Sequence, residues 1–293
     1  MTRAPRRAVL ANIPIIIGIV ALFGLGLSLW LLAPSQGDKF SDLGISLGIG
    51  AAVSLGIIYV QTIASNRAAT RERRESEELR FMQTIVSAPD LSNVRMSGRN
   101  LAGIILAERD ISGGDLSSTN LDRVDLRKAD ISRADLSRST GLELNLFAAK
   151  LDKAKLQAVV WPAARLDRAV GADVDFSRAV VHNATFNDAR LHRALFDGTE
   201  LDGGDFRRAD LSECAGTGAS ASRVDLRGAT LRGARLTDVS FRGADLRGAD
   251  LRNATIERAD LRGADLRDCL VEGLSLRAPI VDEHTQLPVM PTI

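Results

Sequence analysis

The side chains that most often do chemistry in proteins are scarce in this sequence of 293 residues. It holds three histidines, His182, His192 and His284, and two cysteines, Cys214 and Cys269. Two cysteines are too few for a disulfide framework or a cysteine-based zinc site. The sequence contains no P-loop, nucleophile elbow or zinc-protease helix motif. It therefore predicts a protein that is not an enzyme and that holds no metal and no cofactor.

Charged side chains show a long, regular spacing towards the C-terminus. An aspartate recurs every 20 residues, and an arginine stands two places after each aspartate. These eight residues form the candidate interaction surface: Asp205, Asp225, Asp245, Asp265, Arg207, Arg227, Arg247 and Arg267. Two interpretations are open. The charges neutralise one another, with little stability from each exposed pair, or they form a docking strip that carries both signs of charge.

A repeat of five residues explains the even spacing of the aspartates. Every fifth residue from Met96 to Leu276 falls in one register of 37 positions, and large apolar residues occupy 33 of these centres. The residue two places before a centre is usually small, and glycine often stands two places after it. Carboxylate pairs such as Asp173 and Asp175 follow from this repeat and do not indicate a catalytic dyad. The four undersized centres are Gly141, Gly171, Gly216 and Ala221.

A period of five fits neither an α-helix nor the alternation of a β-strand. Two inward-facing residues in each pentad predict a short extended step followed by a turn. Glycine after the centre supplies the positive φ that such a turn can need. A unit this small cannot bury a core by itself, so the pentads are expected to stack as a solenoid.

The clearest run, ADLRGADLRNATIERADLRGADL at residues 244–266, resembles the pentapeptide-repeat family. The family pattern is alanine, then aspartate or asparagine, then leucine and two variable residues. The resemblance implies an all-β solenoid over residues 91–281, a right-handed, four-sided β-helix with four pentads in each coil. Stacked strands lie ~4.8 Å apart, so about nine coils would make a rod ~45 Å long.

A coil of four pentads predicts which side chains stack in the core. Three undersized centres would each lie beside an aromatic ring that compensates for the lost volume. The pairs are Gly141 with Trp161, Gly216 with Phe196 and Ala221 with Phe241. Gly171 has no such neighbour, and we expect a local bulge there. The run at 214–222 is expected to be the weakest part of the rod. The two histidines of the repeat would point outward on opposite sides, and the two cysteines inward on different faces.

Two uncharged runs, Ala8–Gly37 and Leu43–Asn66, predict a two-span transmembrane anchor within residues 1–66. A cleaved signal peptide is the alternative for the first run, but its apolar part is long and a second run follows at once. Arginines precede the first run and follow the second, whereas Lys39 is the single positively charged residue of the connecting loop. Positive charge concentrates on the cytoplasmic side of membrane proteins, so both termini are expected in the cytoplasm. The prediction is a multi-pass protein of the inner (plasma) membrane, in contact with the lipid bilayer, with a two-helix transmembrane hairpin before the β-helix.

Three further segments complete the predicted organisation. Small residues four apart give the second span a smooth face, which would pack on the first span or on a second copy of the chain. These residues are Gly44, Gly48, Ala52 and Gly56. Residues 67–90 are expected to form a charged juxtamembrane helix and N-terminal cap, with the apolar stripe Leu79, Met82, Ile85 and Val86. The tail, 282–293, would cover the last coil or be disordered.

Charge separates the function classes that a rod without a cleft allows. From Met96 to Val281 the chain has 28 Lys and Arg against 28 Asp and Glu. Pentapeptide-repeat proteins that mimic duplex DNA and bind DNA gyrase need a strongly negative rod, and binding nucleic acid directly needs a basic excess. We therefore expect a non-enzymatic, membrane-tethered scaffold or protein-interaction module for a cytosolic or membrane protein partner. The alternative is a topoisomerase-binding DNA mimic.

Overall fold

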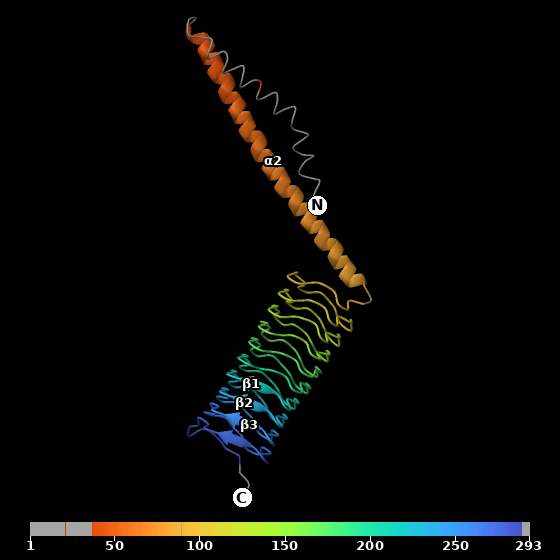
Figure 1. Ribbon diagram of the computed structural model, residues 1–293, viewed down its shortest axis with the longest axis vertical. Helices are drawn as coiled ribbons and strands as arrows, with labels where there is room; N and C mark the ends of the chain where they lie inside the picture. Colours follow the sequence, from red (N-terminus) through yellow and green to blue (C-terminus); the bar gives the residue numbers. More distant parts are fainter. Residues whose placement is uncertain (1–20, 22–36, 89, 289–293) are drawn as a thin grey trace. The chain divides into compact units, whose positions relative to one another are not determined.

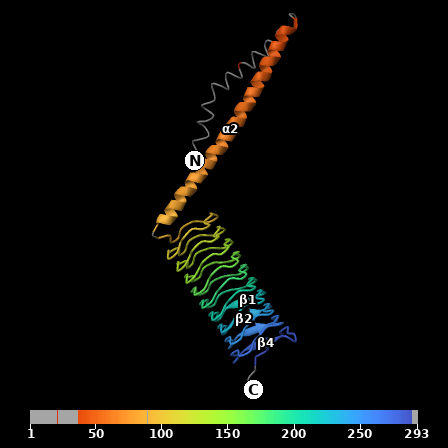
Figure 2. The same cartoon turned by 180° about the vertical axis from the view of Figure 1, so that it is seen from behind.

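The computed structural model describes residues 21, 37–88 and 90–288. The chain divides into two compact units, Met1–Thr84 and Ile85–Ile293. Among the described residues, the regular elements are one long helix, followed in the second unit by four short strands. They are α2 (Gly37–Ser87), β1 (Ala215–Thr217), β2 (Arg235–Thr237), β3 (Thr255–Glu257) and β4 (Ser275–Arg277). Figures 1 and 2 show the second unit from opposite sides as a stack of similar coils (Figure 1, Figure 2).

Helix α2 joins the second uncharged run and the charged segment after it in one helix of 51 residues. Within the described part of the chain, no helix combines the length and the apolar character needed to cross a membrane. The prediction of a multi-pass inner-membrane protein with a two-helix transmembrane hairpin is therefore wrong. Except for residues 21 and 37, the first predicted span lies outside the described residues.

The C-terminal end of α2 is part of the second unit. Ile85 belongs to that unit and is buried, with 1% of its surface exposed. Leu79, two turns earlier, is 65% exposed. Just beyond the helix, Arg109 donates a hydrogen bond from Nη1 to the carbonyl oxygen of Ala88 at 2.5 Å. Of these two members of the predicted capping stripe, only the one at the helix end is buried.

One coil of the second unit consists of four pentads. Parallel bridges join the residue before a centre to its equivalent four pentads later, as in Asp125↔Asn145. Strands β1 to β4 continue this pairing as one parallel sheet in the order β1-β2-β3-β4. The centres Gly216, Leu236, Ile256 and Leu276 are in register in that sheet. The predicted β-solenoid with four pentads per coil is confirmed.

Each pentad turns at the residue two places after its centre. Every residue at this position from Asn93 to Ala278 has a positive φ, twelve of them glycine and 26 of other types. None of the 26 is β-branched or aromatic, because such side chains fit the left-handed region worst. In most pentads the next backbone N–H donates to the carbonyl oxygen of the centre, as Val124 does to Leu121 at 3.1 Å. This is the bonding of a type II turn, which needs a left-handed third residue.

The aspartate or asparagine before the centre closes the same turn from its other end. In 17 pentads its Oδ1 accepts the backbone N–H two residues later, as Asp125 does from Arg127 at 3.1 Å. In five pentads without Asp or Asn there, an aspartate of the preceding coil accepts instead, as Asp202 does from Ser222 at 2.7 Å. Aspartate recurs in the chain because each turn exposes a backbone donor that needs an acceptor.

The core is a column of side chains from the two inward positions. Every centre from Met96 to Val271 is buried, and so is every residue two places before a centre from Gly114 to Ala264. Phenylalanines of successive coils stack in the middle of the column. The ring centroids are 5.4 Å apart for Phe176 and Phe196 and 4.4 Å apart for Phe186 and Phe206. The inward and outward assignment from the sequence is confirmed.

Two of the undersized centres are filled by their surroundings. A methyl group placed on Gly141 would lie 3.1 Å from Cδ1 of the buried Trp161, so the predicted compensation by an aromatic ring is confirmed there. A methyl group on Gly171 would lie 2.8 Å from Cβ of Leu151. The chain after Gly171 makes a bend instead of the usual turn, which agrees with the irregularity expected at this glycine.

Candidate interaction surface

The eight predicted surface residues lie together on one side of the C-terminal coils. Parallel bridges join Asp205, Asp225, Asp245 and Asp265 in one column, and the four arginines follow two residues later. Within each pentad, arginine Nη2 lies 2.6 or 2.7 Å from Oδ2 of its aspartate. We call these eight residues the Asp–Arg ladder.

Contacts between coils join the four pairs into one network. Nε of Arg207, Arg227 and Arg247 lies 3.8, 3.6 and 3.7 Å from Oδ2 of the aspartate in the next coil. The aspartate side chains are 22–30% exposed and the arginine side chains 43–57% exposed. The arginines therefore form the outer layer of the ladder, and the aspartates hold them from beneath.

Ion pairing favours the charged forms of Asp245, Asp265 and Arg247 in the ladder. Hydrogen bonds from Arg247 hold the pKa of Asp245 below its ordinary value, and those from Arg267 do the same for Asp265. The contact with Asp245 raises the pKa of Arg247. Each partner thus stabilises the charged form of the other.

The ladder begins where two coils break the charge pattern. Arg165 stands in the aspartate column and Asp167 in the arginine column, so the order is reversed there. The coil between carries Thr185 and Asn187. Asn187 donates from Nδ2 to Asp167 Oδ1 and to Asp205 Oδ2, both at 3.0 Å. This amide separates two carboxylates and fixes Asp205 as the first step of the ladder.

Asp–Arg pairs of the same geometry occur on other sides of the rod. Arg252 lies 2.6 Å from Asp250, and Arg262 lies 2.6 Å from Asp260. The pair is therefore a general device of the repeat. What distinguishes the ladder is that four pairs stack in successive coils and contact one another.

The residues first considered for catalysis or metal binding have separate partners. His182 Nε2 lies 2.9 Å from Glu200 Oε2, and its side chain is 35% exposed. Asp173 binds Arg193 at 2.7 Å. Asp175 accepts a hydrogen bond from Gln157, so the two aspartates do not act as a dyad.

Both cysteines occupy the small inward position, as predicted. Cys214 is buried, and burial raises the pKa of its thiol to about 12. Burial also raises the pKa of Cys269 to about 11. The Cys269 thiol donates to the carbonyl oxygen of Leu246 at 3.1 Å. Both thiols are protonated at neutral pH, whereas a nucleophilic cysteine needs a lowered pKa.

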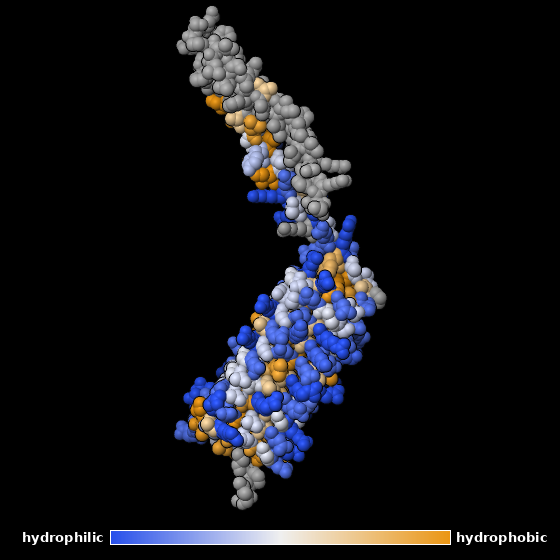
Figure 3. Space-filling model, in the orientation of Figure 1, coloured by the Kyte–Doolittle hydropathy of each residue, from blue (hydrophilic) through white to orange (hydrophobic). Residues whose placement is uncertain are grey.

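Sequence reasoning missed a second kind of ion pair, which joins turn residues of successive coils. The three bidentate examples have closest distances of 2.7 Å and are Asp173 with Arg193, Asp188 with Arg208, and Asp238 with Arg258. The signal was present, because each pair has opposite charges at the turn position and exactly one coil apart in the sequence. These pairs occur on different sides of the rod and form no ladder. The face of the β-helix seen in Figure 3 is mostly hydrophilic, with smaller apolar areas between (Figure 3).

Comparison with known proteins identifies the repeat. The family model described as pentapeptide repeats matches in eight copies, over residues 106–140, 175–213, 196–233 and 234–273. No curated protein sequence matches the chain.

Solved structures similar to this chain are also pentapeptide repeat proteins. HetL, involved in heterocyst differentiation regulation in the cyanobacterium Nostoc, is 23% identical, covering 68% of this chain and 92% of its own, with a TM-score of 0.26. A protein from the cyanobacterium Cyanothece is 21% identical, covering 43% and 90%, with a TM-score of 0.29. Full-length QnrB1, a plasmid-mediated fluoroquinolone resistance protein, is 17% identical, covering 64% and 92%, with a TM-score of 0.27. TM-scores this low do not show structural similarity, so the fold assignment depends on the hydrogen bonds described above.

Proposed function

This chain is a pentapeptide-repeat protein, and we propose that it is a non-enzymatic scaffold or protein-interaction module whose docking surface is the Asp–Arg ladder. The observation that carries the proposal is the continuous network of eight charged side chains over four coils. The partner is a protein whose surface offers acceptors to a row of arginines spaced by one coil, ~4.8 Å.

The order already present in the ladder favours binding. Arg247 is held by Asp245 through Nε at 2.9 Å and Nη2 at 2.7 Å. A guanidinium carries five N–H donors in a fixed fork, and the Arg247 side chain is 43% exposed, so donors remain for a partner. Side chains that are already ordered lose less conformational entropy on binding. Charges of both signs also restrict the partners that can dock.

The side chains inside the rod support a function without catalysis. The cavity among the C-terminal coils is lined by apolar side chains and one cysteine. That cysteine has a raised thiol pKa, the opposite of an activated nucleophile. The aspartates of the repeat are engaged as acceptors for turn N–H groups, which accounts for their number without a catalytic role.

The alternative function, a topoisomerase-binding DNA mimic, has weaker support. Such a mimic must present uncompensated negative charge at regular spacing. In the ladder each aspartate is covered by an arginine that is more exposed than it is. A gyrase supercoiling assay separates the two functions, because a DNA mimic would inhibit supercoiling and an interaction module for another partner would not.

A charge-reversal experiment tests the ladder. The ladder variant changes three arginines to glutamate, namely Arg227, Arg247 and Arg267. The matched control changes three arginines that pair with aspartates on other sides, namely Arg242, Arg252 and Arg262. Both variants alter the net charge equally, and both should stay folded because exposed ion pairs contribute at most about 1 kcal/mol each.

The measurement is quantitative crosslinking and co-purification from native cell extract at equal expression. We expect the ladder variant to lose its specific partner at least tenfold, about 1.4 kcal/mol, and the control to retain it. Equal capture by wild type, ladder variant and control would reject the ladder as the docking surface. Equal loss in both variants would reject it as well, because net charge alone would then explain the binding.

A further inference from the structure

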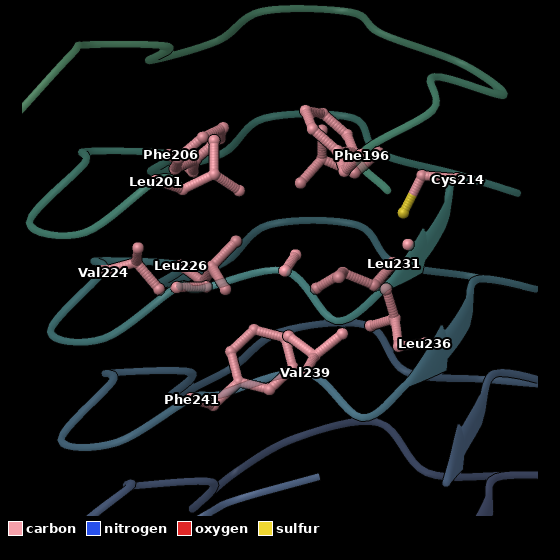
Figure 4. A pocket seen from close by; sticks show the side chains of 14 residues that line it. Phe196, Leu201, Phe206, Cys214, Val224, Leu226, Leu231, Leu236, Val239 and Phe241 are labelled. Carbon is pink, nitrogen blue, oxygen red and sulfur yellow. The ribbon is translucent and has the colours of Figure 1, made fainter. Parts of the chain in front are cut away.

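Two undersized centres leave an apolar cavity among the core side chains of the rod. Gly216 and Ala221 lie on adjacent sides of one coil, where most other coils carry large side chains. The cavity between them has a volume of about 40 Å³. Figure 4 shows that the labelled side chains of Phe196, Phe206 and Phe241 surround the space (Figure 4).

The compensation that fills the core elsewhere is incomplete here. A methyl group on Gly216 would lie 3.5 Å from Cβ of Phe196, which is ordinary van der Waals contact, so the site has room. At Gly141 the equivalent distance to Trp161 is 3.1 Å. The centres around the cavity also keep some accessible surface, 8% for Leu201 against 0% for Leu251. A water-sized probe therefore fits inside the core at this place.

The lining decides what the cavity can hold. Its fourteen lining residues are aliphatic, aromatic or glycine, apart from Cys214, whose sulfur lies at the edge of the group in Figure 4 (Figure 4). A buried water needs two to four polar partners and at least about 10–15 Å³ of room for its centre. The cavity offers the room but not the partners. Apolar cavities of this kind stay dry and take apolar guests such as xenon.

We propose that the cavity between Gly216 and Ala221 is a binding site for one small apolar molecule. The class of ligand is a noble gas atom, a short hydrocarbon or a molecule of similar size without hydrogen-bonding groups.

Xenon titration followed by NMR of methyl groups tests the site with the full chain. We expect saturable shifts for the methyl groups of Leu226 and Val239, which line the cavity. Ala221→Leu fills the space with the side chain that most centres carry and should reduce xenon affinity at least tenfold. The control is Thr230→Leu, which adds the same side chain at a half-buried, outward position and should leave the binding unchanged.

A second variant keeps the test decisive if Ala221→Leu does not fold. Leu226→Ala enlarges the cavity and should increase the xenon-induced shifts at Val239. Three results would each overturn the proposal. They are equal shifts in wild type and Ala221→Leu, no saturable shift in wild type or Leu226→Ala, and cross-relaxation with a long-lived water at the cavity methyl groups.

Discussion

Replacing Ser139 by alanine should destabilise the fold through one buried hydrogen bond. Trp161 is fully buried and donates from Nε1 to Ser139 Oγ at 3.0 Å, and Ser139 is itself fully buried. The substitution keeps nearly the same side-chain size and removes the acceptor. An unsatisfied buried donor costs about 1–3 kcal/mol. We therefore expect the free energy of unfolding to fall by about 2 kcal/mol.

The assay is urea unfolding followed by circular dichroism, which should show a lower midpoint with an unchanged m value. Ser137→Ala is the matched control, because Ser137 lies two residues before Ser139 at an outward position and its hydroxyl donates to Gln157 Oε1 at 2.8 Å. Its effect should stay within about 0.5 kcal/mol.

A double-mutant cycle isolates the hydrogen bond from the loss of packing. Trp161→Phe removes the donor, so Ser139→Ala should cost much less in that background than in wild type. The coupling energy should be about 1 kcal/mol or more. The reasoning is refuted if Ser139→Ala and Ser137→Ala have the same effect, or if the coupling energy is near zero.

Three other perturbations probe an undersized centre, the core column and the ladder. Gly171→Ala should lower stability by about 1–3 kcal/mol, because its methyl group would lie 2.8 Å from Cβ of Leu151; urea unfolding measures this. Leu246→Arg should abolish the cooperative thermal transition, since it buries an unpaired charge at a position with 0% exposure, whereas Arg247→Ala should leave it nearly unchanged. Hydrogen bonds from Arg247 lower the folded-state pKa of Asp245, so their stabilisation is present above the unfolded pKa of about 3.9 and is lost as the pH falls below it. Unfolding midpoints at pH 7, 4 and 3 should therefore fall more steeply for wild type than for Arg247→Ala, and parallel curves would contradict this.

Some features of the interaction surface were visible in the sequence, and others were not. The constant spacing of Asp205, Asp225 and their equivalents, four pentads in each case, predicted that the two columns stack, and the structure places them so. The contacts between coils, such as Arg227 Nε to Asp245 Oδ2 at 3.6 Å, depend on side-chain rotamers that spacing does not specify. The role of Asp125 and its equivalents as acceptors for turn N–H groups was also missed, because a backbone donor becomes visible only when the turn is built.

The N-terminal prediction shows a limit of reasoning from charge. The run Leu43–Asn66 has no charged residue, yet among the described residues no helix is long and apolar enough to span a membrane. The structure continues this run into the charged residues of α2 without a break. A charged helix was expected to continue directly after this run, and α2 covers both segments.

The sequence by itself determined the register and the inward positions, and its resemblance to the pentapeptide-repeat family implied the coil of four pentads. A period of five with two apolar positions allows little besides a stacked coil, since a single pentad cannot bury its own core. Only the tertiary structure decided how closely the core side chains of neighbouring coils pack. Gly141 and Gly216 are identical residues beside aromatic rings, yet the first is filled and the second borders a cavity. The difference depends on contact distances of a few tenths of an ångström between coils, and packing at that scale is set by three-dimensional complementarity, not by the order of residue types.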